Sequence, residues 1–349
     1  MAPAETVSLL AGPSGGGHVV EVPGVQPSQY STRNSPAKGL APGAQNRPGS
    51  APHGSAGRRK PLGERPAGYA GGMSDHAGSA FPVAVAQFAP GADAAANLAE
   101  IERLAALAAT RGARLVVFPE YSSYFTPDPG QDWQQAAEEV GGPFTERLAA
   151  IATRLDVHLV AGMIERLGGD ERRVGNTVVA VAPAIGVVAR YRKLHLYDAF
   201  GYTESSLVQP GEIEPPQTFT VGGLRFGLQT CYDLRFPEVT RRLVDAEADV
   251  VLVPAEWVPG PLKEDHWTTL LRARAIENTV YLAAADLCGR NGAGNSMIVD
   301  PMGVVLASVG EEEGLGTASL DPERIERVRA KNPAIRLRRF SVVETTQRV

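Results

Sequence analysis

The 349-residue chain carries 34 Lys and Arg against 39 Asp and Glu, and its net charge of −5 gives no electrostatic basis for binding nucleic acid or an anionic membrane. No apolar run approaches the roughly 18 residues that a membrane-spanning helix needs, so no membrane span is predicted. The two cysteines, Cys231 and Cys288, argue against a disulfide framework and fit a reducing compartment, so we expect a cytoplasmic protein.

Residues 1–72 differ in composition from the rest of the chain. Gly, Pro, Ala and Ser make up 41 of these 72 residues, and Phe, Trp and Ile are absent. Such a segment buries too little apolar surface to offset the entropy of ordering it. It also lacks the basic start and apolar centre of a secretory signal. We therefore expect a disordered extension, with Met73 as an alternative start of translation.

From about residue 80 onward, strand-like and helical patterns alternate along the chain. We expect strands at residues 81–88, 114–118, 157–163, 176–182, 187–190, 224–230, 249–253 and 280–285, and helices at residues 92–110, 144–155, 237–246 and 265–278. A turn at residues 300–303 links two final strands. Mixed strands and helices at this spacing predict an α/β domain.

Several common functional motifs do not occur in the sequence. The Gly-rich residues 12–18 lack the Lys-Ser/Thr ending and the preceding strand of a phosphate-binding loop. The six His residues are scattered, and the two Cys residues lie 57 positions apart, so no zinc-ligand spacing is present. Residues 294–298 are not a nucleophile elbow, because Ile298 stands where the last glycine would be. We expect no metal and no other cofactor.

Cys231 is the first candidate for a catalytic residue. It follows a strand-like apolar run and precedes the polar and charged stretch Tyr232-Asp233-Leu234-Arg235. A thiol at such a junction is a candidate nucleophile. A lone cysteine is also commonly a small buried hydrophobe, and both interpretations fit this residue taken alone.

Two further segments end in residues that complement a thiol. Glu120 follows the apolar run 115–118 and Pro119, and Lys193 follows another β-rich run. A carboxylate can take the proton of a thiol, and an ammonium group can stabilise an oxyanion. The alternative is a solvated Glu at a strand end and a surface Lys between Arg192 and His195.

The order of Glu120, Lys193 and Cys231 in these contexts resembles the nitrilase, or carbon–nitrogen hydrolase, superfamily. Matching segments continue at residues 200–205, 210–211, 266–267, 272–278 and 294–303, so that the resemblance covers about residues 81–340. It implies a four-layer α-β-β-α sandwich, commonly paired through helices that flank the sheets. We therefore expect a homodimer or a higher homo-oligomer.

The resemblance also implies roles for individual residues. Cys231 would attack an amide carbon as a thiolate, and Glu120 would act as the general base. Lys193 and the backbone N–H of Tyr232 would bind the oxyanion. Glu204 falls where the family often has a second carboxylate, which holds the lysine and positions the substrate; a loop carboxylate at a helix start is the alternative.

Two other polar residues need no catalytic role. No histidine is required by this chemistry, so His195 is expected to be a structural hydrogen-bonding residue. Cys288 ends an apolar strand and is expected to be a core or rim thiol.

Substrate choice is less constrained. The stretch from Cys231 to Glu238 resembles the Nit-type amidases, whereas true nitrilases usually have Trp-Glu after the cysteine. Arg235 stands where carbamoylase branches bind a substrate carboxylate, but it could equally pair with Glu238 or Asp233. Glu256 would disfavour an anionic substrate tail and favour an amine or a hydroxyl.

The remaining expected substrate-binding residues are Tyr121 and Trp257, next to Glu120 and Glu256 in the sequence. The resulting prediction is a hydrolase that cleaves a small, ω-amide-like amide through a cysteine thioester and releases ammonia and a carboxylate. An N-carbamoyl amide hydrolase, a nitrilase and a catalytically silent interaction module remain alternatives.

Overall fold

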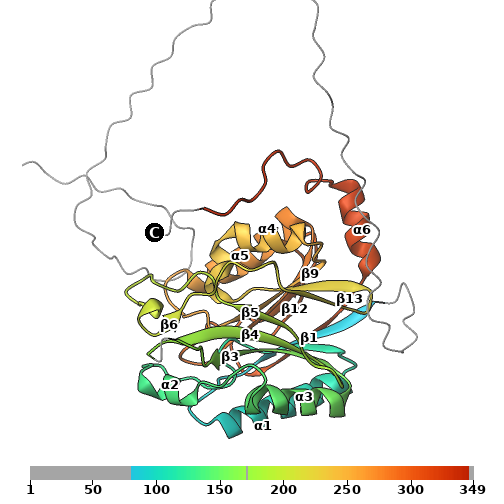
Figure 1. The fold of residues 1–349 in the computed structure, drawn as a ribbon. Coiled ribbons are helices and arrows are strands. Elements are labelled where there is room, and N and C mark those ends of the chain that lie inside the picture. Colours follow the sequence, from blue (N-terminus) through green and yellow to red (C-terminus); the bar gives the residue numbers. More distant parts are fainter. Residues whose placement is uncertain (1–79, 170–171, 346–349) are drawn as a thin grey trace, which may run out of the picture. The chain divides into compact units, whose positions relative to one another are not determined.

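The computed structural model describes residues 80–169 and 172–345. The extension expected at residues 1–72 lies outside these ranges. Among the described residues, no helix combines the length and apolar character needed to cross a membrane. The strands form two sheets, and helices lie on the outer face of each (Figure 1).

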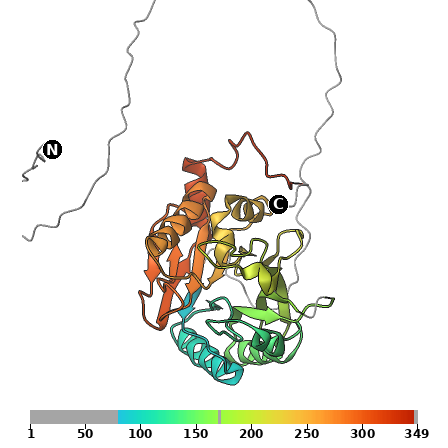
Figure 2. The same cartoon turned by 90° about the vertical axis from the view of Figure 1, so that its left-hand side faces the viewer.

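The first sheet has the strand order β13-β1-β2-β3-β4-β5, with the short β6 paired to β4. Its strands are β1 (Phe81–Gln87), β2 (Leu115–Val117), β3 (His158–Glu165), β4 (Val174–Ala182), β5 (Gly186–Arg192), β6 (Val208–Gln209) and β13 (Gly314–Leu320). Strands β1, β2 and β3 are parallel. Strand β13 returns antiparallel to β1, so the cyan start of the domain lies beside its orange C-terminal strands (Figure 2).

The second sheet has the strand order β12-β11-β10-β9-β8-β7. Its strands are β7 (Thr218–Val221), β8 (Leu224–Leu228), β9 (Val250–Ala255), β10 (Tyr281–Asp286), β11 (Met297–Val299) and β12 (Val305–Ser308). The three central strands β8, β9 and β10 are parallel. Each sheet therefore has a parallel centre whose carboxyl ends can carry polar residues.

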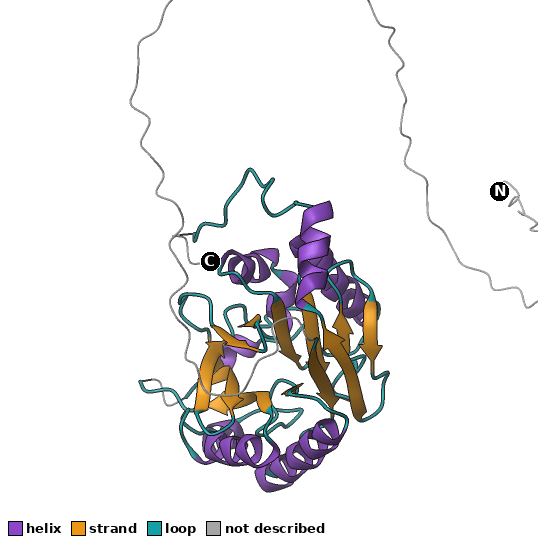
Figure 3. Ribbon diagram, turned by 90° about the vertical axis from the view of Figure 1, so that its right-hand side faces the viewer, coloured by secondary structure: helices purple, strands orange, loops and turns teal. Residues whose placement is uncertain are grey.

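Helices cover the outer faces of both sheets, as the purple ribbons in Figure 3 show. The helices are α1 (Ala94–Thr110), α2 (Gln131–Ala136), α3 (Pro143–Leu155), α4 (Pro237–Asp245), α5 (Lys263–Asn278) and α6 (Pro322–Lys331), with 3₁₀ turns at Glu204–Ser206 and Cys231–Arg235. Helices α1 and α3 pack on the first sheet, and α4 and α5 lie on the second. The fold is the four-layer α-β-β-α sandwich predicted from the sequence.

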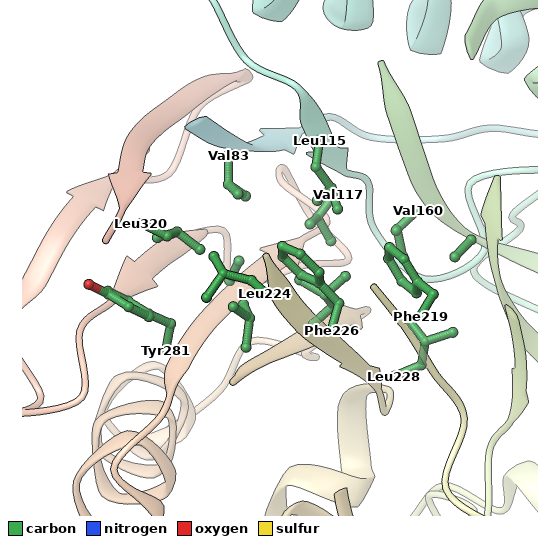
Figure 4. Close-up of a cluster of buried hydrophobic side chains, with 14 of the residues drawn as sticks. Val83, Leu115, Val117, Val160, Phe219, Leu224, Phe226, Leu228, Tyr281 and Leu320 are labelled. Atoms are coloured by element: carbon green, nitrogen blue, oxygen red, sulfur yellow. The ribbon is translucent and has the colours of Figure 1, made fainter. Parts of the chain in front are cut away.

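The alternation of side chains along the strands explains these layers. In β1, Val83 and Val85 face the core between the sheets, whereas Ala84 and Ala86 face the helices. The inter-sheet core also receives Phe226 and other apolar side chains from the second sheet (Figure 4). Burying one such large side chain contributes about 1.5–3 kcal/mol, so this core holds the two sheets together.

All of the expected helices and strands are present, with ends shifted by a few residues. The helix expected at 265–278 begins two residues earlier, at Lys263, and the strand expected at 157–163 extends to Glu165. The turn at 300–303 links two strands, β11 and β12, as expected, but these are not the final strands, because β13 follows them. Helices α2 and α6 and strands β6, β7 and β13 are additional elements that the sequence patterns did not predict.

The carboxyl ends of the two parallel centres meet in space. Glu120 lies shortly after the end of β2 in the first sheet. In the second sheet, Cys231 lies shortly after the end of β8, and Glu256 directly follows β9. The backbone nitrogen of Glu120 donates a 3.3 Å hydrogen bond to the carbonyl of Ala255, which joins the two sheets at this place. The candidate site lies at this junction.

Candidate active site

Three of the predicted site residues form a buried charged cluster. Lys193 Nζ lies 3.0 Å from Glu120 Oε1 and 2.9 Å from Glu204 Oε2. The exposed fractions of Glu120, Lys193 and Glu204 are 0%, 2% and 3%. Charges at this depth are retained only with close partners. The three side chains therefore form a buried, mutually paired cluster. This excludes the alternatives of a solvated Glu120 and a surface Lys193.

Glu120 is held at both carboxylate oxygens. Its Oε1 accepts hydrogen bonds from Lys193 Nζ and, at 2.6 Å, from Asn176 Nδ2. Its Oε2 accepts a 2.6 Å hydrogen bond from the backbone nitrogen of Glu256. Burial raises the pKa of Glu120, against the opposing charge of Lys193. A carboxylate with a raised pKa and a fixed orientation is suited to take up and return a proton.

The backbone at Glu120 lies against β3 at Gly162. A Cβ atom at position 162 would lie 2.6 Å from Glu120 Cα and 2.7 Å from Tyr121 N, closer than real Cβ contacts. Gly162 N also donates a 3.0 Å hydrogen bond to the carbonyl of Pro119. The missing side chain of Gly162 thus allows the Glu120 segment to approach β3.

Lys193 and Glu204 stabilise each other's charged form. Burial acts to lower the pKa of Lys193, but the charges of Glu120 and Glu204 hold it well above its usual value. Burial acts to raise the pKa of Glu204, but Lys193 and the backbone N–H of Tyr197 lower it overall. Tyr121 donates a further 2.7 Å hydrogen bond to Glu204 Oε1. Lys193 is accordingly a charged donor fixed between two carboxyl groups.

Cys231 begins the 3₁₀ turn that follows β8, and its φ of 44° lies in the left-handed region. Non-glycine residues with such backbone angles are concentrated at functional sites. The Sγ atom donates to the backbone carbonyl of Glu256 at 3.2 Å. Burial and the charge of Glu120 raise the pKa of Cys231 well above its usual value. The resting residue is therefore a thiol, and it needs a base to become a nucleophile.

The segment after Lys193 is tied to the turn that contains Cys231. The buried carboxylate of Asp233 accepts hydrogen bonds from His195 N at 3.0 Å, from His195 Nδ1 at 2.8 Å and from Tyr191 OH at 2.7 Å. The ring of His195 stacks on Phe236, with centroids 3.7 Å apart. His195 thus has the structural hydrogen-bonding position expected for it, and these contacts fix Lys193 and Cys231 relative to each other.

Cys231 opens onto a cavity of about 230 Å³. Aromatic side chains, among them Tyr121 and Trp257, form much of its wall. Its charged lining side chains are Lys193, Glu204, Arg235, Glu256, Lys263 and Arg290. All of the predicted substrate-binding residues are therefore in this cavity. Cys288 is absent from its lining, and burial raises the pKa of that thiol to about 11.

Arg235 does not pair with Glu238 or Asp233, which corrects that alternative. Its guanidinium carbon lies 4.7 Å from the centre of the Trp257 ring, and Asp233 is occupied by the contacts described above. The Nε and Nη2 atoms of Arg235 are buried and have no hydrogen-bond partner among the described residues. The charge lies against an aromatic face, and no Asp or Glu of residues 80–169 and 172–345 forms an ion pair with it.

Lys263 is a second cation in the same wall, and the sequence patterns did not single it out. Its side chain is buried, and its Nζ donates a 2.6 Å hydrogen bond to Tyr197 OH. Burial is the main cause that lowers the pKa of Lys263, and the charge of Arg235 adds to it. The sequence pattern predicts a helix that begins at residue 265, whereas α5 begins at Lys263, so the pattern gives no signal for this lysine.

Glu256 faces the cavity with a carboxyl group that resists ionisation. Burial, followed by the charges of Glu120 and Asp286, raises its pKa well above the usual value. The expectation that Glu256 repels anionic substrate tails assumed an ionised side chain. A protonated Glu256 carries no charge, so its effect on substrate preference depends on pH.

Asn176 is another site residue that the sequence patterns missed. Its Nδ2 lies 2.6 Å from Glu120 Oε1, 2.7 Å from Tyr121 OH and 3.1 Å from Glu204 Oε1. The only signal is one amide side chain in the otherwise mostly apolar β4.

Among the described residues, no group of three or more His, Cys, Asp and Glu side chains is arranged to hold a metal ion.

The family model described as carbon-nitrogen hydrolase matches residues 82–330. A protein named as a hydrolase from Mycobacterium tuberculosis (strain H37Rv) is 37% identical over 270 residues, which cover 73% of this chain and 94% of the relative. A deaminated glutathione amidase from Synechocystis is 38% identical over 256 residues, covering 70% and 93% of the two chains.

Solved structures with the same fold include an amidase from Nesterenkonia sp. AN1. One substituted form of that amidase shows covalent addition of the acetamide moiety of fluoroacetamide at the active-site cysteine. It superposes with a TM-score of 0.64 at 31% identity, covering 77% of this chain and 97% of the amidase.

Proposed function

This chain belongs to the carbon–nitrogen hydrolase family, and on that premise we propose that it hydrolyses a small linear amide through a thioester on Cys231. The observation that carries the proposal is the Glu120–Lys193 pair, buried at 3.0 Å beside the cavity that contains Cys231. The expected products are ammonia and a carboxylate.

The acylation half of the reaction begins with the thiol. Glu120 takes the proton of Cys231, and the sulfur forms a bond to the amide carbon. The carbonyl oxygen then becomes an oxyanion, which Lys193 and the backbone N–H of Tyr232 stabilise. Glu120 returns the proton to the leaving nitrogen, the C–N bond breaks, and ammonia departs from the thioester.

The deacylation half uses the same base again. Glu120 takes a proton from water, whose oxygen attacks the thioester carbon. The C–S bond breaks, the sulfur recovers a proton, and the carboxylic acid product leaves. Glu204 keeps Lys193 charged and in place throughout, because its carboxylate lies 2.9 Å from Nζ.

Two named relatives support this chemistry. Covalent addition at the active-site cysteine of the Nesterenkonia amidase is what a nucleophilic thiol would give. The relative from Synechocystis is named a deaminated glutathione amidase. Both names favour an amide over a nitrile as the substrate of this chain.

We assign the binding of a substrate carboxylate to Arg235. The buried Nε and Nη2 atoms lack an acceptor, and a carboxylate supplies two acceptors for one guanidinium. The Trp257 ring would lie against the guanidinium, and Tyr121 would hold Glu204 while forming part of the wall. Glu256, when protonated, would donate a hydrogen bond to a polar group of the substrate.

A substrate panel tests the proposal. Purified protein is incubated with butyramide, succinamate, N-carbamoyl-β-alanine and butyronitrile, and the release of ammonia and CO₂ is measured. We expect ammonia from the amides and little from the nitrile. Release of CO₂ from the carbamoyl compound in preference to both amides would favour the N-carbamoyl alternative. No turnover of any compound would favour the silent module.

The Glu120→Gln variant checks the mechanism within that panel. Glutamine cannot accept the proton, so we expect kcat on the best amide to fall by at least about 10²-fold, the lower range for general acid–base catalysis. The Glu238→Gln variant, which changes an exposed glutamate on α4 in the same way, is the control. Equal activity of the two variants would contradict the role of Glu120.

We also propose that the protein is cytoplasmic and forms a homodimer or a higher homo-oligomer. Leu337, Phe340 and Val343, after α6, are 70%, 89% and 77% exposed. Such apolar side chains are favourable in an interface between subunits. Light scattering across a range of protein concentrations tests the assembly, and a monomer at every concentration would contradict it.

A further inference from the structure

One peptide group connects Cys231 to a buried carboxyl group that the proposed mechanism does not use. The carbonyl of Glu256 accepts from Cys231 Sγ at 3.2 Å. The N–H of the same peptide group, which belongs to Trp257, donates a 2.7 Å hydrogen bond to Asp286 Oδ1. A peptide group is planar, so its carbonyl and its N–H turn together. The contact with Asp286 therefore sets the direction in which the carbonyl meets the thiol.

The proposed base depends on the neighbouring peptide group. The N–H of Glu256 donates a 2.6 Å hydrogen bond to Glu120 Oε2. The two peptide groups share the α-carbon of Glu256, so a displacement of that carbon alters the contact with Glu120 as well as the contact with Cys231. Asp286 thus holds a short segment on which both proposed catalytic residues rest.

Asp286 is itself firmly held. It is the last residue of β10 and has no exposed surface. Its Oδ1 also accepts a 2.9 Å hydrogen bond from Leu287 N. Its backbone nitrogen donates at 2.9 Å to Ser296 Oγ, which donates at 2.7 Å to Gln87 Oε1 on β1 of the first sheet. These contacts fix Asp286 relative to both sheets.

The second oxygen of Asp286 indicates that stability alone does not explain this residue. Asp286 Oδ2 is buried and has no hydrogen-bond partner among the described residues. A buried polar atom without a partner is unfavourable for folding. Burial also raises the pKa of Asp286 well above its usual value, so the acid form is favoured. Departures of this kind from ordinary packing are expected at functional sites.

We propose that Asp286 is a positioning residue, which orients the peptide group between Glu256 and Trp257 so that Cys231 and Glu120 stay aligned for reaction. This role needs an acceptor oxygen at the place of Oδ1 and no negative charge. Asp286 is not among the described residues that line the cavity, so it acts through the peptide and not on the substrate. The inference rests on the proposed function, because it takes Cys231 as the nucleophile.

The test compares Asp286→Ala and Asp286→Asn with wild type on the best amide of the panel. Asp286→Ala leaves the Trp257 N–H without its acceptor, so we expect kcat to fall by about 10²-fold, the effect of a small misplacement of reacting groups. KM should change much less, since no contact with substrate is lost. Asp286→Asn keeps an oxygen acceptor and should recover most of the lost kcat. Wild-type kcat in Asp286→Ala, or equal kcat in the two variants, would overturn the proposal.

The Asp300→Ala variant is the matched control. Asp300 is also a buried carboxyl group whose Oδ1 accepts two backbone hydrogen bonds, from Met302 N at 2.8 Å and from Val304 N at 2.9 Å. It lies in the turn between β11 and β12, so its removal should lower the melting temperature and leave kcat close to wild type. An equal loss of kcat in Asp300→Ala would assign the effect of Asp286→Ala to general destabilisation and overturn the proposal.

Alkylation of Cys231 separates this proposal from the proposed function, because iodoacetamide modifies the thiol without any amide turnover. Peptide mass spectrometry gives the labelling rate of Cys231, and circular dichroism verifies folding; Asp286→Ser, whose hydroxyl ends one bond short of Oδ1, replaces Asp286→Ala if the latter is unfolded. We expect labelling of Asp286→Ala to be at least about tenfold slower than that of wild type, part of the roughly 10²- to 10⁴-fold that a positioned base contributes.

The outcomes of this experiment are distinct. Slower labelling of Asp286→Ala, with recovery in Asp286→Asn, supports the positioning role even if wild type hydrolyses no amide, which would contradict only the proposed function. Equal labelling rates of wild type and folded Asp286→Ala would overturn the positioning role.

Discussion

The backbone nitrogen of Glu256 donates a 2.6 Å hydrogen bond to Glu120 Oε2. Glu256 follows a strand of the second sheet, so its backbone holds the proposed base, which follows a strand of the first sheet. The carbonyl of the same residue accepts from Cys231 Sγ at 3.2 Å. Both contacts use backbone atoms. A change of the side chain at position 256 can therefore alter the charge in the cavity while leaving these contacts in place.

The first prediction concerns the ionisation of Glu256. Its raised pKa in the folded protein means that its contribution to stability is complete below the unfolded value and is lost as the pH rises through the folded pKa. Glu256→Gln has no such ionisation. We expect the melting temperature of wild type to fall relative to Glu256→Gln as the pH increases from about 5 to about 9. Curves of melting temperature against pH that run parallel for the two proteins would contradict the raised pKa of Glu256.

The same variant tests the effect of Glu256 on substrates. At low pH, where Glu256 is protonated, wild type and Glu256→Gln should have the same preference between succinamate and butyramide. At higher pH the ionised carboxylate should disfavour succinamate in wild type only. Asp265→Asn, at an exposed position on α5, is the control for removing a negative charge. If wild type and Glu256→Gln differ by the same amount at every pH in their preference between succinamate and butyramide, ionisation of Glu256 does not explain the difference.

The second prediction concerns the nucleophile. Cys231→Ala and Cys231→Ser should abolish ammonia release and leave the circular dichroism spectrum unchanged, since the substitution removes only a small group from the cavity wall. Iodoacetamide should label Cys231 before Cys288, because Cys231 faces the cavity and has Glu120 as a base. A substrate amide should slow that labelling. Ammonia release by Cys231→Ala at the wild-type rate would refute the assignment.

The third prediction separates binding from catalysis at Lys193. An oxyanion donor acts mainly in the transition state, so Lys193→Ala should lower kcat by about 10²- to 10³-fold. The effect on KM should be small by comparison. Removing Lys193 also leaves Glu120 and Glu204 without the cation between them, so the melting temperature should fall. An unchanged kcat with a raised KM would assign Lys193 to substrate binding alone.

The fourth prediction follows from the charge of Glu204, which raises the pKa of both Glu120 and Lys193. Without this charge, both pKa values should be lower. Activity requires Glu120 ionised and Lys193 protonated, so both limbs of the kcat/KM profile of Glu204→Gln should move to lower pH. Limbs that stay in place would show that the charge of Glu204 has no influence on the pair.

The fifth prediction uses the contact between Gly162 and the Glu120 segment. Gly162→Ala places a methyl group 2.6 Å from Glu120 Cα, so the segment must move and kcat should fall by about 10²-fold or more. Gly91→Ala is the control, because a Cβ at position 91 has no atom within 4 Å. If Gly162→Ala has wild-type kcat, the position of Glu120 tolerates displacement.

The fold was predictable where the sequence patterns are local. Alternating apolar residues in β1, such as Val83 and Ala84, belong to different faces of a strand and fit a buried sheet. The segment Gly314–Leu320 has only a weak strand pattern in its sequence. It becomes strand β13 through pairing with β1, which is far away along the chain. Helix α2 has only six residues, too few for a helical period to be visible.

The site was predictable to a similar degree, for a related reason. Glu120, Lys193 and Cys231 stand in recognisable motifs, whereas Asn176 and Lys263 have no local signal. Their place in the site results from strand pairing and from the start of α5, which are tertiary features. The partner of Arg235 was likewise undetermined, because nearness in sequence to Glu238 did not bring the two charges together in space.

The 3.3 Å hydrogen bond between Glu120 N and the carbonyl of Ala255 has a consequence for ligands. A substrate that contacts Lys193 on the first sheet and Arg235 beside the second would connect the two sheets. Its binding energy then opposes their separation, and the folded state gains stability with ligand concentration. Ligand binding in the cavity and unfolding of the sandwich would then be linked equilibria.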